Sequence, residues 1–76
     1  MRADVCDPND DAAFQRFKDA LVALGAVQVD AAFAIGVDMI DLEIDGEKLA
    51  VFIDPWSVDV KGPRALVERL RRAMQT

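Results

Sequence analysis

The dipeptide Asp45-Gly46 is the feature that most constrains how this chain folds. It separates two runs in which polar and apolar residues alternate, VDMIDLEI at positions 37–44 and EKLAVFI at positions 47–53. Asp-Gly between such runs is typical of a two-residue type I′ turn, because both turn residues need positive φ. The sequence therefore predicts an antiparallel hairpin over residues 37–54.

The turn also fixes which side chains share a face of the hairpin. With Ile44 opposite Glu47, Met39 faces Phe52 on one side of the ribbon. Glu43 and Lys48 are expected on that same side as a cross-strand ion pair. The opposite side then carries six aliphatic residues, namely Ile40, Leu42, Ile44, Leu49, Val51 and Ile53. A shift of the strand pairing by one residue would expose all six side chains to solvent.

A helix is predicted on each side of the hairpin. The first covers residues 8–24, with Asp7 as N-cap, Pro8 at the first position and Gly25 at the C-cap. The second begins at Pro63 and ends near the C-terminus. Their apolar stripes follow the helical period and consist of Phe14, Phe17, Leu21 and Leu24 in the first helix, and Leu66, Val67, Leu70, Ala73 and Met74 in the second.

The remaining segments are less patterned. Residues 26–33 are interpreted as a first strand, followed by a turn at 34–36, and the alternative for this segment is a loose loop. The second strand of the hairpin ends at Asp54-Pro55, because Pro55 cannot donate to a strand ladder. Residues 56–60 then form either a short edge strand or an extended connection. Residues 1–6 are interpreted as a leader, frayed or extended.

These elements predict an α+β two-layer sandwich in the order α-β-β-β-(β)-α. The sheet is an antiparallel meander, and both helices lie on one face of it. A chain of 76 residues forms a single domain, here 1–76. The predicted core consists of Phe14, Phe17, Leu21, Leu24, Val29, Ile40, Leu42, Ile44, Leu49, Val51, Ile53, Leu66, Val67 and Leu70.

Composition argues against catalysis. The chain has no His and only one Cys, Cys6. This inventory excludes an imidazole base, a structural zinc site and an intrachain disulfide. We expect no enzyme, no cofactor and no metal. The lone cysteine fits a reducing compartment, so a cytoplasmic location is expected, and no apolar run is long enough to span a membrane. The thiol of Cys6 lies among four aspartates, which should raise its pKa.

The charge is divided along the chain. Residues 1–60 hold thirteen acidic and four basic residues, whereas residues 61–76 hold five basic residues and one acid, for a net charge of −5. An acidic protein repels nucleic acid. Lys61 and Arg64, at the start of the basic helix, are the candidate anion-binding residues. The simpler interpretation is that this helix carries solvated charges.

The candidate partner-binding surface is the side of the sheet turned away from the helices. Its predicted members are Val37, Met39, Asp41, Glu43, Phe52 and Trp56. An apolar patch with an acidic rim suits a protein partner, and Asp41 and Glu43 favour a basic one. The alternative is that the leader or residues 55–60 cover Met39 and Phe52. Partial burial against Pro55 and the sheet edge is favoured for Trp56.

The sequence thus predicts a small acidic, non-catalytic protein-interaction module of an accessory, immunity/antitoxin or chaperone-like kind. A first alternative is a homo-oligomer that uses the same face or a free strand edge. A second alternative is weak phosphate or RNA binding by the basic C-terminal helix.

Overall fold

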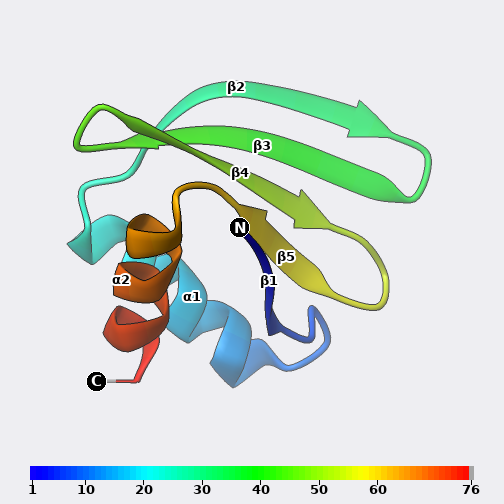
Figure 1. The fold of residues 1–76 in the computed structure, drawn as a ribbon. Helices are drawn as coiled ribbons and strands as arrows, with labels where there is room; N and C mark the ends of the chain where they lie inside the picture. The colour runs from blue at the N-terminus through cyan, green and yellow to red at the C-terminus, as the bar shows by residue number, and fades with distance from the viewer. Residues whose placement is uncertain (76) are drawn as a thin grey trace.

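Two helices cover one face of a five-stranded sheet in this computed structural model, which describes residues 1–75 (Figure 1). The sheet is antiparallel throughout, in the order β1-β5-β4-β3-β2. The predicted α+β two-layer class is confirmed, with one strand more at the N-terminus. The elements are β1 Arg2–Cys6, α1 Asp11–Ala23, β2 Val27–Ala34, β3 Val37–Ile44, β4 Glu47–Ile53, β5 Val58–Lys61 and α2 Arg64–Met74.

The central hairpin has the predicted register. Ile44 pairs with Glu47 at the turn, and Met39 pairs with Phe52 near the far end of β3 and β4. Asp45 and Gly46 have φ values of 52° and 80°, as a type I′ turn requires. The aliphatic side of the hairpin therefore faces the helices. We call this side of the sheet the inner face and the opposite side the outer face.

The N-terminal residues extend the sheet. The extended alternative for residues 1–6 is correct, because β1 pairs with β5 from Arg2, opposite Lys61, onward. The N-terminal ammonium donates to the Gly62 carbonyl at 2.9 Å and fixes the start of the strand. β5 is therefore an interior strand between β1 and β4, and its predicted edge position is wrong.

Both helix starts lie later than predicted. Asp10, not Asp7, is the N-cap of α1, and its side chain accepts from the Ala13 backbone N–H at 3.1 Å. Asp7 instead accepts from the Asn9 backbone N–H at 2.8 Å, within the turn that leads from β1 into α1. Pro63 occupies the N-cap position of α2, one residue before the first position. Within residues 1–75, neither helix combines the length and the apolar run that a membrane crossing needs.

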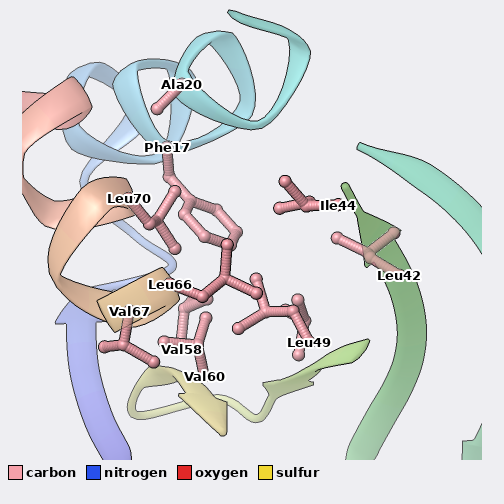
Figure 2. Packing of buried hydrophobic residues seen from close by; sticks show 11 residues of the cluster. Phe17, Ala20, Leu42, Ile44, Leu49, Val58, Val60, Leu66, Val67 and Leu70 are labelled. Carbon is pink, nitrogen blue, oxygen red and sulfur yellow. The ribbon is translucent and has the colours of Figure 1, made fainter. Parts of the chain in front are cut away.

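The core lies where the helices meet β3, β4 and β5 (Figure 2). Val58 and Val60 are fully buried, although sequence analysis left them out of the core. The predicted burial of Val29 is wrong, because a β-bulge between Gln28 and Asp30 leaves Val29 without a partner and half exposed. The clustered buried residues are Phe17, Ala20, Leu42, Ile44, Leu49, Val51, Val58, Val60, Leu66, Val67 and Leu70.

Several predicted core residues are only partly buried. They are Phe14, Leu21, Leu24, Ile40 and Ile53, which pack against the buried cluster from its margin. The helices therefore cover the inner face unevenly. Burial is greatest over β4 and β5 and decreases toward β2.

Candidate functional site

The outer face has an apolar strip at its centre. Met39 and Phe52 lie opposite each other in β3 and β4, and Val37 lies two residues from Met39 on the same side. Met39 has 38% of its surface exposed. Val37 and Phe52 are half-buried. Ala32 pairs with Met39 in the neighbouring strand and adds a small, flat surface beside it.

Phe52 is partly screened by one side chain. The Arg2 guanidinium lies over its ring, with the central carbon 4.7 Å from the ring centroid. The same guanidinium donates to Asp59 at 3.0 Å, which holds it in place. The alternative that residues 1–6 cover Met39 and Phe52 is therefore limited to this one contact with Phe52. β1 lies beside the other strands of the sheet and not over its outer face. Met39 remains exposed beside this contact, so the strip is only partly covered.

Acidic side chains border the strip on the β2–β3 side. Asp41 is exposed, and Asp30 lies directly opposite it. Like charges in this position destabilise a strand pair. Asp30 accepts a hydrogen bond from the Ala31 backbone N–H at 2.8 Å. Among residues 1–75, three ion pairs form, and none involves Asp41.

The predicted ion pair between Glu43 and Lys48 does not form. The two residues do lie opposite each other in the register. The three ion pairs among residues 1–75 all join other residues, which shows that the charged groups of Glu43 and Lys48 are not within ion-pair distance. Glu43 is half-buried and adds a third carboxylate, after Asp30 and Asp41, to the acidic side of the outer face.

Trp56 is not partly buried. It is 84% exposed in the loop between β4 and β5. The Asp54 carboxylate shapes this loop by accepting from the backbone N–H groups of Trp56 at 2.8 Å and Ser57 at 2.7 Å. These two hydrogen bonds lower the pKa of Asp54. The turn projects the indole into solvent, away from the burial against Pro55 that sequence analysis favoured.

The two candidate anion-binding residues have different surroundings. Lys61 pairs with Ala50 and Arg2 and so lies on the outer face. Arg64 begins α2 in the helical layer and forms an ion pair with Glu68 at 3.2 Å. Anion binding by these two residues therefore stays a prediction.

The acidic and thiol groups do not form a metal site. Over the described residues, no three His, Cys, Asp or Glu side chains are placed to hold a metal ion. Burial and the carboxylate of Asp4 raise the pKa of the Cys6 thiol, with Asp10 and Asp7 adding to the effect. The direction agrees with the sequence analysis.

The most exposed apolar residues of β2 and its turn lie outside the predicted site. Phe33 is 74% exposed, and Ile35, in the turn between β2 and β3, is fully exposed. The sequence places Phe33 at the end of the predicted first strand and Ile35 in the predicted turn after it, and assigns neither to a face. The pairing of Phe33 with Asp38, itself opposite Ile53, places Phe33 on the inner face.

The chain was compared with protein-family models, curated proteins and solved structures, and none of them matches it.

Proposed function

We propose that this chain is a non-catalytic protein-interaction module that binds a basic protein partner through the outer face. The observation that supports this function is the placement of the Met39–Phe52 pair beside a carboxylate without an ionic partner, Asp41. Surfaces that combine apolar area with one sign of charge suit a partner of the opposite sign.

The two kinds of side chain have different roles in this proposal. Met39 and the open part of Phe52 supply contact area that loses water on binding. Asp41 lies opposite Asp30, so a cation from the partner would relieve the repulsion between two adjacent carboxylates. Charge then sets the orientation and the rate of association, while the apolar strip sets how long the complex lasts.

A charge reversal tests the proposal. Asp41→Lys removes the acid beside the strip, and Asp19→Lys makes the same change of net charge on α1, in the helical layer. The probe is a fluorescein-labelled peptide of alternating lysine and leucine, followed by fluorescence anisotropy. We expect Asp41→Lys to weaken binding about tenfold or more, as one favourable charge contact becomes repulsive. Asp19→Lys should weaken peptide binding much less.

Backbone amide NMR identifies the surface that the peptide uses. We expect the shifts to concentrate in β3 and β4, around Met39 and Phe52, and to fade with added salt. Equal weakening by the two variants would mean that only net charge matters. Shifts centred on the helices would place the contact elsewhere. Either result contradicts docking on the outer face.

A further inference from the structure

An apolar groove opens on the inner face, between α1 and the strands β2 to β4. Its volume is about 330 Å³, and its lining is almost wholly apolar, with Lys18 and Gln28 at its margin. In Figure 1, β2 and β3 extend beyond the two helices on the side away from α2. The other residues of the lining are Phe14, Phe17, Leu21, Ile40, Leu42, Val51 and Ile53.

Two large apolar side chains project from the end of the same overhanging hairpin. Phe33 lies on the inner face, opposite Asp38, and most of its ring is exposed. Ile35 follows in the turn and is fully exposed. The molecule therefore carries an exposed apolar tip at the end of this hairpin and an apolar groove on its inner face, and the two surfaces have matching apolar chemistry.

Pairing along the free edge of β2 is discouraged by the strand itself. The Asp30 carboxylate accepts from the Ala31 backbone N–H, which an added strand would otherwise use. The bulge at Val29 interrupts the regular spacing of the edge. Charged side chains and bulges are the features by which proteins prevent edge-to-edge association. Contact through the inner face has no such obstacle.

We propose that the occupant of the groove is a second copy of this chain. A two-fold axis beside the groove places the Phe33–Ile35 tip of each copy in the groove of the other, which gives a closed, isologous dimer. Lys18 at the groove and Asp38 beside the tip have opposite charges, so the same symmetry can bring them together across the interface. The outer faces remain free on the two sides of the dimer.

The area is enough for a weak but specific dimer. If Phe33 and Ile35 each bury roughly 150 Å² and cover an equal area of groove, two such contacts remove about 1,200 Å² from water. Stable interfaces begin at about this size. We therefore expect a dimer that dissociates on dilution through the micromolar range.

Sedimentation velocity over a concentration series tests the dimer, with a matched pair of variants in one strand. Phe33→Lys places a lysine opposite Asp38 on the inner face, and Val27→Lys places one opposite Glu43 on the outer face. Both variants gain the same charge beside an acid, so both should keep the fold, which circular dichroism checks. We expect Phe33→Lys to raise the dimer dissociation constant at least about tenfold. Val27→Lys should leave it unchanged.

Three results would overturn the proposal. The first is a wild-type chain that stays monomeric up to millimolar concentration. The second is a dimer that Val27→Lys weakens and Phe33→Lys does not, which would place the contact on the outer face. The third is a dimer that Asp30→Ala strengthens while Phe33→Lys has no effect, which would indicate pairing of β2 edges. The first and third results do not bear on peptide binding at Asp41, whereas the second would put the dimer contact on the face proposed for the peptide.

Discussion

Gly46 lies in the turn of the central hairpin and Gly62 packs against β4, and substitutions at these two glycines test the fold through the free energy of unfolding. Gly46 has a φ of 80°, and a Cβ added there would have nothing within 4 Å. Gly46→Ala therefore costs only the strain of a left-handed backbone, about 1–2 kcal/mol. Gly46→Asn should recover part of that loss, because Asn adopts this conformation more readily than Ala.

Gly62 precedes α2 and is restricted for a different reason. Its φ lies outside the left-handed region, but a Cβ there would be 3.0 Å from the Lys48 carbonyl oxygen and 3.0 Å from Leu49 Cδ1. The leucine side chain can shift, whereas the carbonyl belongs to β4. Gly62→Ala should cost about 1–3 kcal/mol through overpacking. Gly62→Asn should be no better, because it adds volume in the same place.

Thermal unfolding followed by circular dichroism separates the two mechanisms. For a domain of this size, 1 kcal/mol lowers the Tm by about 4–8 °C. Both alanine variants should therefore show a clear loss, and asparagine should rescue position 46 alone. Rescue at both positions would mean that contact with β4 is not what restricts Gly62. No loss at position 46 would refute the type I′ turn.

Two further predictions concern titratable groups. The carboxylate of Asp54 contributes stability fully above its ordinary pKa of about 4, and this contribution disappears as pH falls through the lowered pKa of the folded state. The Tm difference between wild type and Asp54→Asn should therefore be larger at neutral pH than near pH 3, and an unchanged difference would contradict the role of its backbone hydrogen bonds. At neutral pH, iodoacetamide should alkylate Cys6 more slowly than free cysteine, because burial and Asp4 raise the pKa of its thiol. Asp4→Asn should speed the reaction, and a wild-type rate equal to that of free cysteine would contradict the assignment.

The sequence predicts the β3–β4 hairpin well because its determinants are local. Asp45 and Gly46 select one turn, the turn sets the pairing, and the pairing assigns every side chain of both strands to a face. The outer-face members of the candidate site in β3 and β4 follow from the same reasoning, since Met39 and Phe52 occupy opposed positions.

No local sequence signal predicts the pairing of β1 with β5. Arg2 and Lys61 are opposed in the sheet although 59 positions separate them in the chain. Neither segment has a turn signal that links it to the other, and both are short with mixed charge. Val58 and Val60 are buried because their side chains point from β5 into the core cluster, which contains Leu66, Val67 and Leu70 of α2. The contacts that bury them come from tertiary packing, which four residues of sequence pattern do not specify.

The exposure of side chains at the candidate site also depends on tertiary structure, namely on loop conformation and side-chain rotamers. The register placed Glu43 opposite Lys48 but could not determine whether their flexible side chains would meet. Trp56 followed a proline, which predicted the end of a strand, yet the direction of its indole depends on how Asp54 folds the loop. A register assigns faces, whereas loops and side-chain rotamers decide what is exposed on them.

The open groove lies toward the edge of the sheet that the two helices cover least. Five strands at about 4.8 Å each need roughly 24 Å of cover, and two helices of about 10–12 Å span that width only when they lie over its centre. Because α1 and α2 pack on each other and against β1, the uncovered width falls at the opposite edge, beneath β2. Phe33 in β2 and Ile40 in β3 lie on the inner face toward this edge, and Ile40 is half-buried at the groove. In the proposed dimer, the Phe33–Ile35 tip of the second copy supplies apolar cover at this edge and leaves both helices in place.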